Sequence, residues 1–314
     1  MKGEKIYMVD YEETIKFKVA YYYYFENMTQ QGIADLLSIS RIRVLKLLEN
    51  ARQTGIIQFK LRENPSFHIE LEKELKETYA LNDVFVVPNA PSEERKNANV
   101  AKAAALYIND RLKGDDHINV GYGDTSKHLL NNLATMAERP ISCISLTGGV
   151  SYYLPDTRPH VFNANLHLIP APLMASSLEM AKAIRQEESV NEIFRMAPLA
   201  QMTVIGIGGM SEKSTIFTTG TLSKNDMLFL KMQGAVGDIL SHFLDADGNL
   251  VESGIEDRLI STPLESLKQL KNVIGVASGD AKVQAIRAAL KGKFLNVLIT
   301  DARTAKMILE DTNA

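Results

Sequence analysis

Residues 29–55 read TQQGIADLLSISRIRVLKLLENARQTG and carry the clearest structural pattern in the N-terminal region. Apolar residues recur at helical spacing over 30–37 and again over 41–54. Only residues 38–40 separate the two segments, so the connection between them must be a tight turn. The pattern predicts two short helices joined at an angle.

The ends of both helices carry their own signals. Thr29 and Ser40 stand where a hydroxyl can accept a hydrogen bond from the first helical turn. Gly55 stands where a helix commonly ends. A further helix over 12–26 precedes this pair, so the sequence predicts a three-helix unit that contains a helix-turn-helix.

The segment 41–54 is strongly basic. Residues 1–62 hold ten Lys and Arg against seven Asp and Glu, whereas the rest of the chain is acidic, with 25 against 31. A small basic module joined to an acidic domain is typical of a DNA-binding sensor protein, although a packing unit without a DNA role is the alternative. The DNA interpretation assigns contacts to Thr29, Gln30, Gln31, Ser40, Arg41, Arg43, Val44 and Lys46.

The chain is long enough for two domains, and residues 62–66, Arg-Glu-Asn-Pro-Ser, suggest where they meet. Residues 56–61 read as a short strand or wing that completes the first domain. We expect a helix-turn-helix domain over 1–62, a linker over 63–67, and an effector-binding and oligomerisation domain over 68–314.

Beyond the linker, short apolar segments alternate with helical ones. After a charged helix over 68–79, we expect strands at 84–87, 118–120, 141–146, 204–207, 273–277 and 295–300, and helices at 97–112, 126–136, 176–184 and 281–290. Alternation of this kind predicts a doubly wound α/β domain, with a parallel sheet covered on both faces.

Several of these strands end in glycine and small polar residues. In an open α/β sheet a ligand lies beyond the carboxyl ends of the strands, where glycine lets the backbone approach an anion. Residues 121–126, GYGDTS, lack the third glycine of a dinucleotide fingerprint and the acidic residue that should follow it. They could cradle a phosphate through Gly123, Thr125 and Ser126, or form no more than a tight strand-to-helix turn.

Three charged residues remain open to two interpretations. Asp238 and Asp245 could form an acid pair in a site, or could be a helix-buried polar group and a turn residue. Lys282 begins a predicted helix, where a surface lysine is the default, but a helix N-terminus is unfavourable for a cation. A bound phosphate would give Lys282 a reason to be there.

The sequence gives little support to other classes of protein, such as disulfide-bonded, membrane-spanning or enzymatic ones. The single cysteine, Cys143, excludes a disulfide framework and a cysteine-based zinc cluster, and no cofactor is expected. No apolar run is long enough to span a bilayer, so we expect a cytoplasmic protein with no membrane partner. We find no lysine phosphate loop, GxSxG elbow or HExxH motif, and therefore expect no enzyme and no metal site.

The residues also resemble a known family, the SorC-type sugar-binding regulators. The resemblance covers nearly the whole chain and is most specific over YYYYFENMTQQGIADLLSISRIRVLKLLENARQTGII. The blocks SLTGGV, IPAPLMASS and GAVGDIL are most similar to the branch that responds to phospho-autoinducer-2. Leu45 and Lys46 depart from the small polar residue and arginine that the family more often has, which leaves the operator sequence open.

The resemblance implies a sensor domain related in fold to sugar-phosphate isomerases and tetramers that bind paired operator sites. It also implies that Asp238 binds effector hydroxyls, that Lys282 binds an anionic end, and that two glycine turns bind the phosphate. The turn residues are Gly121, Gly123, Asp124, Thr125, Ser126, Thr147, Gly148 and Gly149.

Together these observations predict a transcriptional regulator that represses a carbohydrate or signal-uptake operon and whose affinity for double-stranded operator DNA is controlled by a phosphorylated sugar-like effector. We expect a homo-oligomer, from dimer to tetramer. The rival is a sugar-phosphate isomerase or hydrolase with an accessory N-terminal domain, which would need a positioned general base near the glycine turns.

Overall fold

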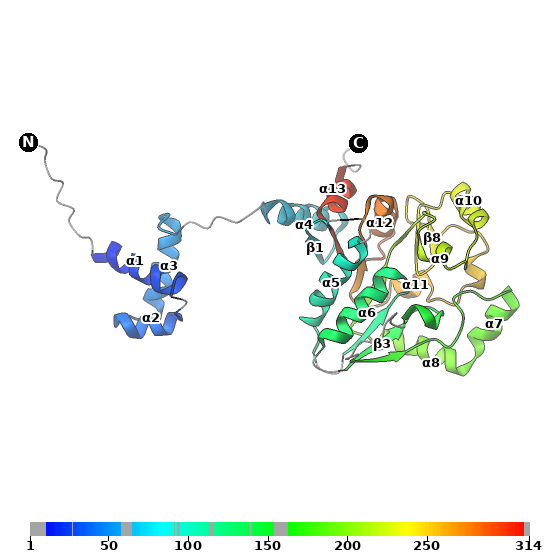
Figure 1. The fold of residues 1–314 in the computed structure, drawn as a ribbon, viewed down its shortest axis with the longest axis horizontal. Coiled ribbons are helices and arrows are strands. Elements are labelled where there is room, and N and C mark those ends of the chain that lie inside the picture. Colours follow the sequence, from blue (N-terminus) through cyan, green and yellow to red (C-terminus); the bar gives the residue numbers. More distant parts are fainter. Residues whose placement is uncertain are drawn as a thin grey trace, which may run out of the picture. The chain divides into compact units, whose positions relative to one another are not determined.

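The computed structural model describes residues 11–26, 28–57, 65–90, 92, 95–113, 116–137, 140–153 and 163–310. The chain forms two compact units, Met1–Pro65 and Ser66–Ala314, which are considered separately (Figure 1). Most of the expected wing, 58–61, and the linker residues 63–64 lie outside the described residues.

The first unit is built from three helices, α1 (Tyr11–Tyr24), α2 (Gln30–Leu37) and α3 (Arg41–Gln53). Their inward faces form one small core, which includes Ile15, Val19, Ile33, Val44, Leu47 and Leu48. The three expected helices are therefore present, with ends shifted by one or two residues. Burial of one apolar stripe from each helix is what holds so small a unit together.

The turn between α2 and α3 has the tight geometry that the sequence predicts. Ser38 adopts a left-handed conformation with φ of 52° and donates its N–H to carbonyls at the end of α2. Thr29 Oγ1 accepts from the amide of Gly32 at 3.1 Å, and Ser40 Oγ accepts from that of Arg43 at 3.2 Å. Both predicted caps are thus formed, and α3 starts where Ser40 directs it.

The second unit contains a seven-stranded sheet in which every neighbouring pair is parallel. All six expected strands occur in it, and β4, which had not been expected, forms one edge. Its order across the sheet is β1 (Asp83–Val87), β10 (Val297–Asp301), β9 (Val273–Val276), β5 (Met202–Gly206), β2 (His117–Val120), β3 (Ile141–Ser145) and β4 (Ala164–His167).

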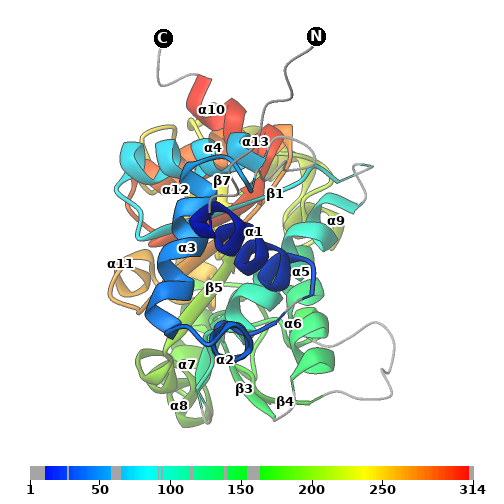
Figure 2. The same ribbon diagram turned by 90° about the vertical axis from the view of Figure 1, so that its left-hand side faces the viewer.

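Helices cover both faces of this sheet, and Figures 1 and 2 show them around the strands. On one face, α5 (Lys96–Asn109) and α6 (Asp124–Met136) pack side by side over alternate strand residues such as Val204. On the other face, α4 (Pro65–Tyr79), α12 (Val283–Lys291) and α13 (Ala302–Glu310) pack over residues such as Ile205. The doubly wound architecture predicted from the sequence is present.

A second, three-stranded sheet was not predicted. It is antiparallel, in the order β6 (Gly208–Gly209), β7 (Gly237–Ile239) and β8 (His242–Leu244). Asp238 therefore lies on a strand, and its interpretation as a helix-buried group is wrong. The segment was hard to assign because Leu240 and Ser241 both take positive φ values, which the β7–β8 turn requires but which side chains other than glycine rarely adopt.

The remaining elements are short and lie between the strands. They are α7 (Leu178–Gln186), α8 (Glu188–Met196), α9 (Thr215–Thr218), α10 (Lys224–Met232) and α11 (Leu264–Leu267), with 3₁₀ turns at Val150–Tyr153, Ala197–Leu199, Glu256–Arg258 and Asp280–Lys282. Within the described part of the chain, no helix combines the length and the apolar character needed to cross a bilayer.

The strand order fixes where a ligand can enter. From β2 the chain proceeds outward through β3 to β4, but β5 lies on the other side of β2. The loops that leave β2 and β5 therefore separate at the carboxyl edge of the sheet and leave a crevice between them. A ligand of such a sheet is expected at this switch point.

Candidate functional site

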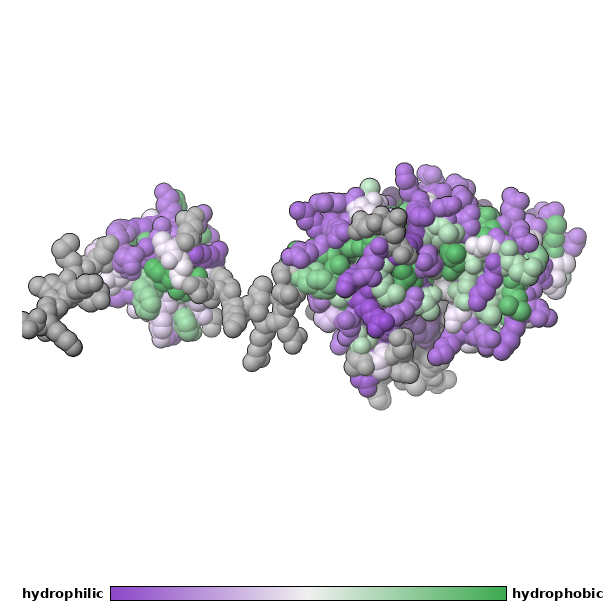
Figure 3. All heavy atoms as spheres, turned by 90° about the horizontal axis from the view of Figure 1, so that it is seen from above, coloured by the Kyte–Doolittle hydropathy of each residue, from purple (hydrophilic) through white to green (hydrophobic). Residues whose placement is uncertain are grey.

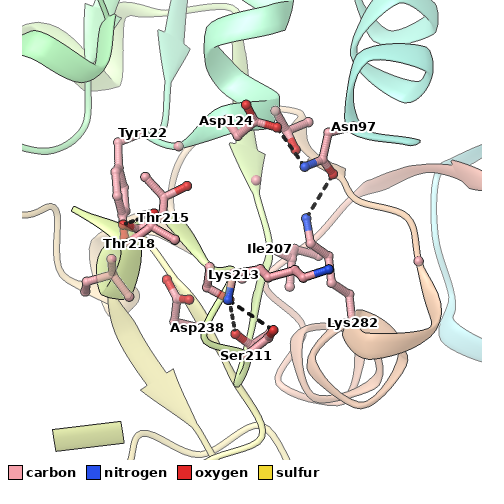
Figure 4. Close-up of a pocket in the computed structure, with 18 of the residues that line it drawn as sticks. Asn97, Tyr122, Asp124, Ile207, Ser211, Lys213, Thr215, Thr218, Asp238 and Lys282 are labelled. Carbon is pink, nitrogen blue, oxygen red and sulfur yellow. Dashed lines mark hydrogen bonds between the residues drawn. The ribbon is translucent and has the colours of Figure 1, made fainter. Parts of the chain in front are cut away.

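A cavity of about 650 Å³ opens at this switch point. Its wall is formed by segments that follow β2, β5 and β9, with contributions from the start of α5 and from the loop between β6 and α9 (Figure 4). Polar and charged groups meet there from parts of the chain that are far apart in sequence. A cavity of this size can enclose a ligand as large as a phosphorylated sugar.

The start of α6 faces the cavity through Gly123, Asp124 and Thr125. Gly123 has φ of 111°, a conformation that glycine adopts without strain, and no side chain caps the helix there. Asn97 Nδ2 donates to Asp124 Oδ2 at 2.8 Å, which fixes the carboxylate against α5. The first amides of α6 remain available to an anion.

Lys282 lies in the wall of the same cavity, so its interpretation as an ordinary surface lysine is wrong. Its ammonium donates to Asn97 Oδ1 at 3.2 Å. Burial lowers the pKa of Lys282, while the carboxylates of Asp124 and Asp238 act in the opposite direction. A half-buried cation whose one hydrogen bond among the described residues goes to a neutral amide is well suited to meet a ligand anion.

Asp238, on β7, is 7% exposed and also lines the cavity. Its Oδ2 accepts from the amide of Ser241 at 3.1 Å, which connects it to the β7–β8 turn. Burial raises the pKa of Asp238 to about 6, against the opposing effects of that hydrogen bond and of Lys282. Gly208 leaves room for the carboxylate, because a Cβ there would lie 1.9 Å from Asp238 Oδ1.

Asp245 does not join Asp238. It lies in the turn after β8, where Oδ1 accepts from the amides of Asp247 and Asn249, both at 2.9 Å. It is absent from the cavity wall, so the acid pair considered from the sequence is not formed, and Asp245 is a turn residue.

The second expected phosphate turn is also not part of the cavity. Gly148 N–H donates to the Ile260 carbonyl at 2.7 Å and Gly149 N–H to that of Ala171 at 2.8 Å. Thr147 is buried, and its hydroxyl is 2.8 Å from that of Tyr153. These donors already have partners inside the protein, so the structure does not bring Thr147, Gly148 and Gly149 to the cavity wall.

Two residues of the first turn lie behind the wall rather than in it. Gly121 packs under Leu240, and a Cβ there would lie 3.0 Å from Leu240 Cδ2. Ser126 is buried, and its hydroxyl contacts the carbonyl of Tyr122 at 3.4 Å. The structure therefore does not place these two residues in the cavity wall, and both support the turn.

Several residues that line the cavity were not identified from the sequence. They are Lys96, Asn97, Tyr122, Lys127, Lys213, Thr215, Thr218 and Ser278. Ser278 could have been found, because it follows β9 in the same kind of small-residue turn. The lysines carried no signal, since a single lysine in a loop or helix is most often an exposed group.

In the first unit, the exposed side chains of α3 include Arg41, Lys46 and Asn50. Arg41 shares a surface depression with Thr29, Gln30 and Gln31, which brings together predicted residues from both sides of the turn. Ile42 and Leu45 are exposed on the same helix, at 67% and 45%. This surface offers cationic, amide and apolar groups of the kind that contact DNA bases and phosphates.

Two of the predicted DNA residues behave differently. Val44 is fully buried in the helical core, so its assignment as a contact residue is wrong, and it positions α3 instead. Arg43 is partly buried and pairs with Glu12 of α1. Arg52 donates to Tyr24 Oη at 2.8 Å, which connects α3 to the tyrosine run of α1.

The described residues contain no group of three or more His, Cys, Asp or Glu side chains that could hold a metal ion. Cys143 is buried on β3, and burial raises the pKa of its thiol to about 12. His242 is also buried, which lowers its pKa to about 4. Neither residue lines the cavity.

Comparison with known proteins identifies relatives over almost the whole chain. Residues 63–310 match Sugar-bind, the model of a sugar-binding domain family. The chain is 34% identical over 302 residues to the transcriptional regulator LsrR of Klebsiella pneumoniae, covering 95% of this chain and 93% of the relative. It is 33% identical to LsrR of Escherichia coli K12, with 95% of each chain covered.

A solved structure gives the same result for the fold. The full-length sorbitol operon regulator SorC from Klebsiella pneumoniae superposes with a TM-score of 0.67 at 27% identity. The match covers 95% of this chain and 100% of that one. Both units therefore have counterparts in one solved protein.

Proposed function

The chain belongs to the SorC-type sugar-binding transcriptional regulators, and on this premise we propose that it represses an operon whose operator it releases when a phosphorylated sugar-like effector binds. Relatives named as transcriptional regulators, together with a sugar-binding domain, support the regulatory part. The phosphorylated effector and the repressor role are our extension.

The composition of the cavity wall is the observation that carries the proposal. Four lysines line the cavity, Lys96, Lys127, Lys213 and Lys282, against two aspartates, Asp124 and Asp238. The excess of positive charge favours an anion, and the amides at the start of α6 face the same space. Asp238, a buried acceptor, suits ligand hydroxyls rather than a phosphate.

The direction of binding follows from these positions. We place the phosphate between the start of α6, at Gly123 and Thr125, and Lys282. The hydroxyl-bearing part of the effector then reaches Asp238, with Thr215 and Thr218 beside it (Figure 4). This arrangement uses the residues of the cavity wall that the structure brings together and leaves the Thr147–Gly149 turn to the fold.

DNA recognition is assigned to α3 and to the start of α2. Arg41 and Lys46 are exposed cations of α3, and Gln30 and Gln31 lie beside Arg41. One helix-turn-helix reads a single half-site, so we propose a symmetric dimer or tetramer bound to a repeated or palindromic operator.

An apolar surface on α1 supports assembly. Phe17, Tyr21 and Phe25 are 61%, 44% and 71% exposed and recur at intervals of four residues, so Phe17 and Tyr21 share one face of α1 and Phe25, just after the helix, extends it. Tyr21 and Phe25 stack with ring centroids 5.4 Å apart. Apolar atoms of this unit are visible at its surface in Figure 3. Such a face is stabilised when a second copy covers it.

A thermal-shift screen of the purified protein against phosphorylated metabolites tests the proposal. A ligand that binds only the folded state raises the apparent stability by mass action. The ligand found in this way is then added to an operator-binding assay, where we expect it to weaken binding. Turnover of every stabilising ligand, with no effect on DNA affinity, would favour an isomerase or hydrolase instead.

A further inference from the structure

The four lysines of the cavity differ in their partners. Lys96 Nζ lies 3.6 Å from Asp280 Oδ1, and Lys282 donates to Asn97. Lys127 also takes part in a polar interaction. Lys213 is exposed and lines the cavity, and among the described residues its ammonium has no acidic partner.

The acidic residue next to Lys213 in the sequence, Glu212, pairs with a different lysine. Glu212 pairs with Lys224 on α10, with Nζ and Oε2 2.8 Å apart. It is therefore engaged outside the cavity, while the next residue, Lys213, extends its side chain into it (Figure 4). The loop thus directs the Glu212 carboxylate away from the cavity and the Lys213 ammonium into it.

The turn that carries Lys213 is fixed to the strand that borders Lys282. Ser214 Oγ donates to the carbonyl of Gly209, and the amide of Lys213 donates to Ser211 Oγ at 3.3 Å. At Gly209 a Cβ would lie 2.6 Å from the carbonyl oxygen of Ala281 and 3.5 Å from Lys282 Cγ. Gly209 therefore lets the two lysine-bearing segments approach one another closely.

We propose that Lys213 is a second anion-binding lysine, which holds a phosphate dianion together with Lys282. This inference rests on the proposed function and names the residue that completes its phosphate site. Two cations that line one cavity repel each other, and a dianion bound to both removes that repulsion and gains a charged hydrogen bond from each. A neutral sugar neither relieves the repulsion nor forms these charged hydrogen bonds. Lys213 therefore favours a phosphorylated ligand over an unphosphorylated one.

The test uses the full-length protein and inorganic phosphate as the probe, with affinity measured by titration calorimetry at constant ionic strength. Lys213→Gln should weaken phosphate binding about tenfold, and Lys213→Arg should keep most of it because a guanidinium also binds phosphate. Lys231→Gln is the matched control, since Lys231 is an exposed lysine of α10 outside the cavity. The control should bind phosphate like the parent.

The outcomes separate the two levels of the proposal. If Lys282→Gln loses affinity while Lys213→Gln binds like the parent, the role of Lys213 is overturned and the phosphate site stands. If Lys213→Gln and Lys231→Gln lose equal affinity for phosphate, the loss reflects the protein's overall charge, and the role of Lys213 is again overturned. If the parent protein does not bind phosphate, both the inference and the phosphate site in the proposed function are wrong.

Discussion

Asn97 accepts a hydrogen bond from Lys282 Nζ at 3.2 Å and so joins the first turn of α5 to the segment that follows β9. The same amide donates to Asp124 at the start of α6. One neutral side chain therefore sets the distance between a cation and a carboxylate in the cavity wall. An ammonium has three N–H donors, so Lys282 can bind a ligand phosphate while it keeps its contact with Asn97.

The two charged groups of the cavity should respond differently to the ligand's phosphate. Lys282→Ala should weaken binding of a phosphorylated sugar about tenfold or more, and its unphosphorylated counterpart much less, because a charged hydrogen bond contributes about 1.5–3 kcal/mol. Asp238→Asn should weaken both, since it acts on hydroxyls. Calorimetry on the four combinations measures this. Equal affinities of Lys282→Ala and the parent for both ligands would exclude Lys282 from the site.

The stability of the ligand-free protein should depend on the ionisation of Asp238. Burial raises its pKa to about 6 from 3.8, so the folded state binds a proton more tightly than the unfolded state does. The stabilisation from this group is complete below about pH 4 and is lost as the pH rises through about 6. The total change is about 3 kcal/mol in the free energy of unfolding.

Asp238→Asn isolates this effect. Urea unfolding of both proteins should show the variant gaining stability relative to the parent between pH 4 and pH 7. His242, whose pKa is lowered to about 4, titrates in both proteins, so its contribution cancels in the difference. A constant difference across this range would show that Asp238 is not buried as an isolated carboxyl.

The surface of α3 should determine operator affinity. Arg41→Ala and Lys46→Ala remove exposed cations, and each should weaken operator binding, by about 1–3 kcal/mol where the side chain reads a base. Arg43→Ala should also weaken binding, but with a loss of thermal stability, because it breaks the pair with Glu12. Fluorescence anisotropy with labelled DNA checks the affinities, and unaltered binding by the Arg41→Ala, Arg43→Ala double variant would rule out α3 as the recognition helix.

Assembly should depend on the apolar face of α1. Phe17→Ser places a small polar group at an exposed position and should leave the three-helix core intact, because Phe17 is 61% exposed. We expect the variant to dissociate at higher protein concentration than the parent in sedimentation velocity runs. Lys18→Ser, a change at an exposed neighbour, is the control. A parent protein that sediments as a monomer with and without DNA would contradict the assembly.

The Thr147–Gly149 turn should affect the fold rather than the ligand. In Gly148→Ala the new Cβ would lie 2.2 Å from the carbonyl oxygen of Pro172, so the backbone must move, at a cost of about 1–3 kcal/mol in unfolding free energy. Gly206→Ala is the control, since its Cβ would meet nothing closer than 3.8 Å. If the Gly148→Ala protein has normal stability but no longer binds the effector, the Thr147–Gly149 turn is part of the effector site after all.

Local signals in the sequence were sufficient for the helix-turn-helix. Thr29 and Ser40 cap the helices as expected, because capping depends on residues three positions apart. The alternation of strands and helices likewise identified the parallel sheet, since buried parallel strands are continuous apolar runs. The assignment that failed in this region was that of Val44 to DNA contact, because Val44 belongs to the core.

The sequence by itself thus determined the helix-turn-helix, the doubly wound sheet and the edge of that sheet where a ligand enters, because each follows from spacing over a few residues. Only the tertiary structure decided which polar groups meet there. The cavity wall draws on four separate segments, which contribute Asn97, Lys213, Asp238 and Lys282. The Thr147–Gly149 turn is equally rich in glycine, but its Gly148 and Gly149 amides donate to carbonyls inside the protein. No local pattern distinguishes these cases, because a hydrogen-bond donor's partner is set by contacts between residues distant in sequence.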